Sequence, residues 1–191
     1  FQPVVDLHGL FQTLSARPVG QGGWAFGGHL HYTDRPLAGG DAKGQPVGLL
    51  HQQWQMDVIG MAGLLSWLEF GVRVPLLMQS GAFPDARLLY GSLSGQSLDG
   101  FFLSDVQLST KITLIGRNRT GFCLGLLGFA TLPVAAWLGQ TQQKMSGDDG
   151  LGGGGSLLLS RHGERFRVAV NLGNNFHAPT QLINLNIKKS N

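Results

Sequence analysis

Apolar and polar residues alternate over strand-length stretches along most of this chain. Within residues 24–32 every even position is aromatic, leucine or glycine, and every odd position is alanine, glycine or histidine. Successive side chains of a β-strand point to opposite faces, so this stretch would present one apolar face and one polar face. The apolar face suits lipid, and the other suits water or a polar interior.

The same alternation, interrupted by turn-forming residues, predicts about eight strands. We expect these strands at residues 24–32, 50–62, 69–78, 103–114, 121–133, 152–160, 165–173 and 182–188. The alternation is weak in the fifth and sixth of them, so the sequence leaves their facing open.

The connections between the expected strands are alternately short and long. The short ones are at residues 63–68, 115–120 and 161–164. The long ones are polar and lie at residues 33–48, 79–102 and 134–151. Outer-membrane barrels have this asymmetry, with short turns at the periplasm and long loops outside. The expected fold is therefore all-β: an antiparallel, up-and-down transmembrane β-barrel that either closes with about eight strands or continues beyond this sequence.

Two other folds stay open at this point. Residues 121–139 form an apolar run about as long as a membrane helix requires, although several glycines and Pro133 lower its helix propensity. A soluble antiparallel sheet with one buried face would also alternate. The membrane barrel is preferred because it also explains the connection lengths.

The composition favours a membrane barrel over a soluble domain. Only 13% of the residues are charged, about half the usual share. The net charge of +3 reflects few acidic residues rather than a block of Lys and Arg, so no nucleic-acid partner is expected. Outer-membrane lipid and lipopolysaccharide are the expected partners instead.

We expect a single outer-membrane barrel domain over residues 1–191. Residues 1–23 would form an N-terminal periplasmic segment or a first strand, and residues 24–191 would carry the barrel strands and loops. Cys123 is the only cysteine, which excludes an internal disulfide and any multi-cysteine metal site.

Charges at inward-facing positions are the main functional lead in the sequence. With the expected register, the lumen is lined by Asp57, Glu69, Arg73, Asp105, Lys111 and Arg167. In a narrow barrel these charges would pair across the interior and close it, whereas in a wider barrel they would line water and bias ion passage. Aromatic residues are expected at the membrane interfaces, at Trp24, Tyr32, Trp67, Phe70, Phe122 and Phe166.

Three histidines are expected to face the lumen: His29, His31 and His51. The first two share one strand face and would ligate a metal if further ligands converged on them. We expect His51 and Asp57 to be neighbours, but the sequence assigns no third ligand. No metal site and no cofactor are therefore expected.

Catalytic residues are not expected either. An outer-membrane lipid hydrolase needs a Ser/His pair at one rim, for which His8, His162 and His177 are the candidate histidines. No Gly-x-Ser-x-Gly elbow is present, and His162 falls in an expected tight turn. The glycine-rich residues 150–156 lack the Lys-Ser/Thr of a phosphate loop.

Four segments resemble the N-terminal barrel of OmpA-like outer-membrane proteins of myxobacteria and related predatory or gliding bacteria. They are LFQTLSARPVGQGGWAFGGHLHYTDRPL at 10–37, LLSWLEFGVRVPLLMQSG at 64–81, LSDVQLSTKITL at 103–114 and FRVAVNLG at 166–173. The resemblance implies a location in the outer membrane of a Gram-negative cell envelope. The chain departs from the family at residues 131–136, where TLPVAA stands in place of the family's Pro-Thr-Gly, and it ends without an aromatic residue.

The expected role is that of an integral bacterial outer-membrane β-barrel protein without enzymatic activity. It would be an anchor or a subunit of a larger envelope assembly, with envelope proteins as possible partners. A porin-like channel for small solutes is the alternative, and an outer-membrane lipid-modifying enzyme is the third.

Overall fold

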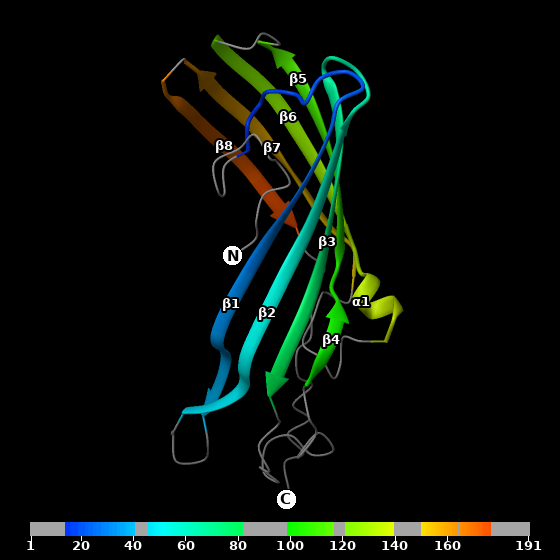
Figure 1. Cartoon of the computed structure of the whole chain (residues 1–191), viewed down its shortest axis with the longest axis vertical. Coiled ribbons are helices and arrows are strands. Elements are labelled where there is room, and N and C mark those ends of the chain that lie inside the picture. Colours follow the sequence, from blue (N-terminus) through cyan, green and yellow to red (C-terminus); the bar gives the residue numbers. More distant parts are fainter. Residues whose placement is uncertain are drawn as a thin grey trace, which may run out of the picture.

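One antiparallel sheet makes up nearly all of the structure (Figure 1). The computed structural model describes residues 14–40, 46–81, 99–116, 121–139, 150–163 and 165–176. Its strands are β1 (Trp24–Gly40), β2 (Pro46–Gly63), β3 (Leu68–Gly81), β4 (Gly100–Leu103), β5 (Val106–Ile115), β6 (Gly121–Leu132), β7 (Gly152–His162) and β8 (Arg167–Phe176). The one helix among these residues, α1, is the single turn Val134–Trp137.

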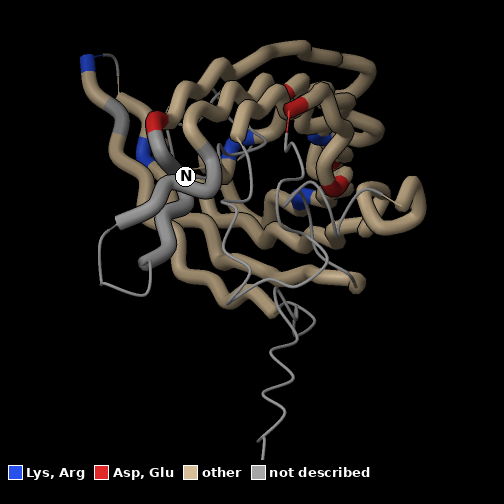
Figure 2. The backbone as a smooth tube through the Cα atoms, turned by 90° about the horizontal axis from the view of Figure 1, so that it is seen from below, with Lys and Arg blue, Asp and Glu red and all other residues tan. Residues whose placement is uncertain are grey.

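The strands follow one another around the sheet in the order β1-β2-β3-β5-β6-β7-β8. The short strand β4 pairs with β3 beyond the end of the β3–β5 ladder. The sheet curls into a half-barrel, whose curvature is visible from below in Figure 2. Among the described strands, β1 and β8 are its two edges. This confirms the expected all-β, antiparallel, up-and-down order.

Strand positions agree well with the alternation of the sequence, with two corrections. Residues 33–48 were expected to form a long loop, but β1 and β2 continue through most of them and pair up to Gly40↔Pro46. Their glycine and proline content is typical of a loop, yet ladder hydrogen bonds use only the backbone, and bulges after Asp34 absorb the irregularity. The expected strand at 103–114 is divided into β4 and β5. The expected strand at 182–188 lies outside the described residues.

The apolar run at 121–139 forms β6 and α1, so it is not a membrane helix. Within the described residues, no helix is long and apolar enough to cross a membrane. The structure also gives the facing that the sequence left open. Cys123 and Leu127 of β6 are buried on the concave face, as are Leu158 and Ser160 of β7.

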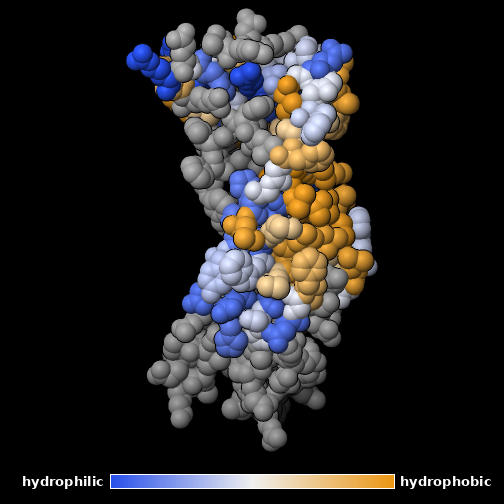
Figure 3. Space-filling view, viewed as in Figure 1, coloured by the Kyte–Doolittle hydropathy of each residue, from blue (hydrophilic) through white to orange (hydrophobic). Residues whose placement is uncertain are grey.

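The two faces of the curled sheet differ sharply in chemistry. The convex face carries large apolar side chains that stay exposed, such as Phe26 (72%) on β1 and Leu172 (68%) on β8. Figure 3 shows this surface as an apolar belt with hydrophilic residues above and below. The concave face is the buried one, and it carries charged side chains such as Asp57, Glu69 and Lys111 among its apolar ones.

Candidate functional site: the interior face and the segment that crosses it

Residues 14–23 lie outside the strands and cross the concave side of the sheet. They run from β7 and β8 past β6, β5 and β3 to the end of β2, where the backbone N–H of Gly22 donates to Gly63 O (2.8 Å). We call residues 14–19 the crossing segment. It lies at the end of the half-barrel that carries the short turns (Figure 1). The sequence placed these residues at the periplasmic side or in a first strand and gave no sign of their position inside the curl.

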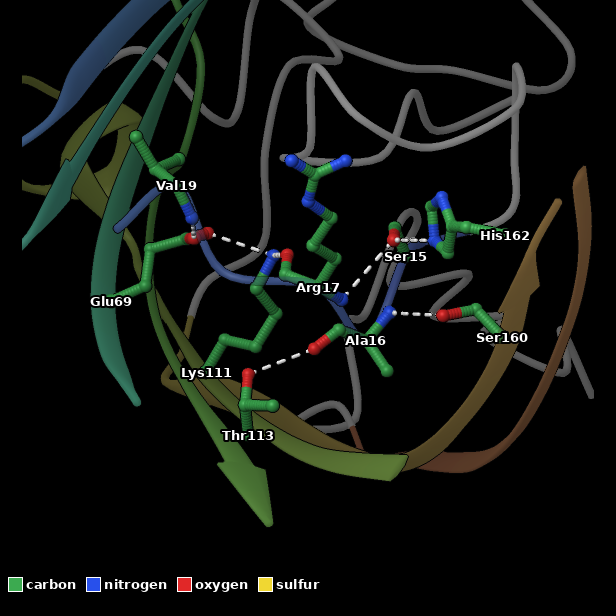
Figure 4. A network of polar contacts seen from close by, with 9 residues as sticks. All are labelled: Ser15, Ala16, Arg17, Val19, Glu69, Lys111, Thr113, Ser160 and His162. Atoms are coloured by element: carbon green, nitrogen blue, oxygen red, sulfur yellow. Dashed lines mark hydrogen bonds and ion pairs between the residues drawn. The ribbon is translucent and has the colours of Figure 1, made fainter. Parts of the chain in front are cut away.

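Side chains of β5 and β7 hold the middle of the crossing segment at Ala16 (Figure 4). The Ala16 N–H donates to Ser160 Oγ (3.2 Å), and Thr113 Oγ1 donates to Ala16 O (2.8 Å). Ala16 is completely buried, in a cluster with Cys123, Leu127 and Leu158. Its main chain is therefore satisfied by side chains rather than by a strand ladder.

A buried ion pair holds the next part of the crossing segment. Lys111 Nζ lies 2.9 Å from Glu69 Oε1, and both side chains are almost fully buried. The second carboxylate oxygen of Glu69 accepts the Val19 N–H (2.8 Å), and the Lys111 ammonium donates to Arg17 O (3.0 Å). Because each charge has a charge partner and a main-chain partner, the pair is compensated where water is scarce.

The start of the crossing segment is held by β7 and β8. With its amide in the orientation that satisfies both groups, Asn171 accepts from Leu14 N (2.7 Å) and donates to Leu14 O (3.1 Å). Ser15 Oγ lies 3.0 Å from His162 Nε2, and it also accepts the Arg17 N–H (3.1 Å). A Ser/His pair thus does converge at one rim, the geometry that a hydrolase needs. Both residues are buried, at 2% and 6% exposure. This contact therefore holds the crossing segment against β7.

The second group of interior charges lies on β1, β2 and β3. The Asp57 carboxylate is fully buried and accepts hydrogen bonds from the Gln55 amide at both oxygens (3.1 and 3.0 Å). Arg73 Nε lies 3.8 Å and His31 Nε2 3.5 Å from its oxygens. The rings of His29 and His31 stack with their centroids 6.2 Å apart.

These contacts correct the expectation that interior charges pair across the lumen. Glu69 and Lys111 are direct neighbours in the β3–β5 register, and Asp57 and Arg73 are diagonal neighbours on β2 and β3. Same-face neighbours on adjacent strands are within reach of long side chains, so the charges pair along the wall. What does cross the concave side is the crossing segment.

Other predicted interior residues lie apart from these two groups. Asp105 is buried, and its Oδ1 accepts a long hydrogen bond from the backbone N–H of Ala135 in α1 (3.4 Å). The side chain of Arg167 lies outside the described part of the structure. His51 is exposed and stands six residues from Asp57 along β2, about 20 Å at the rise of a strand, so these two are not neighbours. Within the described residues no group of His, Cys, Asp and Glu is arranged to hold a metal ion.

The predicted interfacial aromatics lie mostly on the convex face. Trp24, Phe70 and Phe122 are exposed there near the short-turn end, and Phe166 is exposed in the β7–β8 turn. Trp67 lies in the β2–β3 turn and is partly buried. Tyr32 is not at a strand end, because β1 continues beyond it, but its ring packs at 4.7 Å from that of Trp54.

Comparisons of this chain with known protein families, curated proteins and solved structures find no match. The resemblance to OmpA-like barrels accordingly rests on the four sequence segments alone.

Proposed function

We propose that this chain forms the wall of a bacterial outer-membrane β-barrel and acts as a non-enzymatic anchor or subunit of an envelope assembly. The observation that carries this proposal is the apolar convex face opposite a polar, ion-paired concave face. A lipid-facing barrel wall requires this inside-out arrangement. Oligomeric envelope partners and outer-membrane lipid are the partners that such a wall would contact.

The cost of leaving the convex face in water supports the proposal. Removing one large apolar side chain from water stabilises a protein by about 1.5–3 kcal/mol. Exposed apolar residues occur on the convex face of all seven strands of the continuous sheet, among them Leu30, Val58, Val72, Leu108, Leu126, Leu157 and Val170. Each of these side chains would gain free energy on transfer from water into hydrocarbon, so a lipid environment is the natural solvent for this face.

The aromatic residues support a membrane of ordinary thickness. A row of large side chains crosses four strands of the convex face in direct register: Tyr32, Trp54, Met78 and Phe101. The row lies eight residues from Trp24 along β1, which corresponds to about 27 Å along the strand and to about 20 Å of height at the usual strand tilt of about 40°. Outer-membrane barrels have an apolar band of about 25 Å between their aromatic girdles, so this height is close to that of such a band.

The crossing segment favours an anchor over an open channel. It spans the concave side at the short-turn end and fills space that a water path would need. The porin-like alternative is supported by a different observation, namely that the interior charges pair along the wall rather than across the interior. The Ser15–His162 pair does not favour an enzyme, because both residues are buried, Ser15 in the crossing segment and His162 at the end of β7.

The test of the proposal combines detergent dependence with substitutions on the two faces. We expect the purified protein to aggregate without detergent and to migrate differently on a gel before and after boiling. Val72→Arg, on the exposed face, should destabilise the protein in lipid by about 2–4 kcal/mol. The matched control Gln53→Arg, on the concave face, should cost much less. The proposal is refuted if the protein stays monodisperse without detergent and migrates on the gel equally before and after boiling.

A further inference from the structure

The polar side chains that hold the crossing segment contact mainly its main chain. Five inward side chains from β3, β5, β7 and β8 take part: Glu69, Lys111, Thr113, Ser160 and Asn171. They meet main-chain N–H and C=O groups of residues 14, 16, 17 and 19, and Figure 4 shows these contacts except the one between Asn171 and Leu14. Ser15 adds a side-chain contact with His162 (3.0 Å). Every peptide carries main-chain groups, so such an arrangement recognises the backbone.

One position of the crossing segment is also selected by size. The Ala16 side chain is fully buried against β6, where Gly125 faces it. A Cβ atom added at Gly125 would lie 3.5 Å from the Ala16 Cβ, and only 3.0 Å from Ile112 O. A residue larger than alanine at position 16 would have to displace this packing.

We infer that the concave face carries a binding site for a peptide that bends at a small central residue, occupied here by residues 14–19 of the same chain. The crossing segment leaves this site and returns to it. The site follows from the contacts alone, whereas its consequence, a water path that opens when the segment leaves, rests on the proposed membrane barrel in its porin-like alternative.

The attachment of the segment suits reversible docking. Gly20 connects it to the turn before β1 with φ +99°, and no atom lies within 4 Å of the Cβ position there. The next residues are tied to β2, where Gly63 N–H donates to Gly23 O (2.8 Å). The chain from Gly20 onward is thus fixed, because Gly20 O also accepts the Gly23 N–H (3.1 Å), and Gly20 supplies the left-handed backbone where the segment joins this turn. The polar contacts of the segment are individually replaceable by water.

The site is tested by the reactivity of a thiol placed at the central position. In a Cys123→Ser background, Ala16→Cys should react with a maleimide about 100-fold more slowly than Ser66→Cys, an exposed position in the β2–β3 turn. An excess of the peptide LSARPVG, the sequence of residues 14–20, should increase the Ala16→Cys rate several-fold because it occupies the vacated site. The matched peptide LSWRPVG should have no effect.

Two results of that experiment would overturn the inference. If Ala16→Cys reacts only after the protein unfolds, the segment is a fixed part of the wall. If LSARPVG changes nothing, or if LSWRPVG acts equally, the site does not recognise a peptide. If a segment of a second protein, added in place of LSARPVG, increases the rate at which Ala16→Cys reacts, the site also binds that protein.

A disulfide that fixes the crossing segment tests whether its release is needed for conduction. The 3.5 Å Cβ separation falls in the range of disulfides, so Ala16→Cys and Gly125→Cys in the Cys123→Ser background should oxidise to lock the segment. In a planar bilayer, we expect the locked protein to be silent and the reduced protein to show openings. If the peptide increases labelling of Ala16→Cys but no variant conducts, the peptide site is supported and only the channel is refuted.

Discussion

The Glu69–Lys111 ion pair gives the most demanding prediction about the interior. Lys111→Met removes the ammonium but keeps a side chain of similar length. The Glu69 carboxylate would then remain in a buried position, 3% exposed, with the Val19 N–H still bound to it. Removing one partner of a buried ion pair typically costs about 3–5 kcal/mol, because the other charge is left uncompensated.

The contacts of the pair show which part of this loss in the free energy of unfolding comes from the crossing segment. Lys111 also donates to Arg17 O, a charged hydrogen bond of about 1.5–3 kcal/mol, so part of the loss should appear as undocking of the crossing segment. The double variant Glu69→Gln/Lys111→Met leaves no charge at either position of the pair. We therefore expect it to be at least about 2 kcal/mol more stable than the sum of the two single changes predicts.

The assay is urea unfolding in detergent micelles, followed by tryptophan fluorescence, with all four members of the double-mutant cycle. Arg161→Met is the control, because Arg161 is exposed on β7, and it should change the free energy of unfolding by less than about 0.5 kcal/mol. If Lys111→Met lowers the free energy of unfolding by less than about 1 kcal/mol, or if the two single effects simply add, the ion pair does not hold the crossing segment as described above.

Three further results follow from the site. Ser15 should resist a fluorophosphonate probe in the folded protein, and labelling that His162→Ala abolishes would instead indicate an active hydrolase. Gly22→Val should lower the free energy of unfolding by about 1–2 kcal/mol because φ is +70° there, a cost that calorimetry would reveal and that would be absent if the turn adapts. Asp57→Asn should lower the free energy of unfolding in urea by about 3 kcal/mol because it removes the charge beside Arg73, and a loss below about 1 kcal/mol would contradict this.

The alternation of the sequence was sufficient to predict which face of most strands is apolar and exposed. Side chains along a strand have a period of two, so a stretch such as residues 69–78 specifies its own facing wherever one face is apolar. Where both faces are apolar or small, as in β6 and β7, that information is missing. Pairing with β5 and β8 then sets the facing, because each ladder fixes the register of the next strand.

The long β1–β2 hairpin shows a second limit of the sequence. Its outer part contains residues typical of turns, and no side-chain pattern there indicates a strand. Backbone pairing continues nevertheless, because two strands already in register offer ladder partners to the residues that follow.

The sequence by itself determined most of the strands, the short turns between them, the exposed apolar face and the charges of the concave face. These properties depend on neighbours in sequence and on a period of two. Only the tertiary structure decided that the charges pair along the wall and that residues 14–19 cross the interior. The contacts of the crossing segment with the sheet join residues 50 to 157 positions apart, such as Val19 with Glu69 and Leu14 with Asn171. They exist because the curl of the sheet brings distant strands around one segment, and no local pattern encodes that curvature.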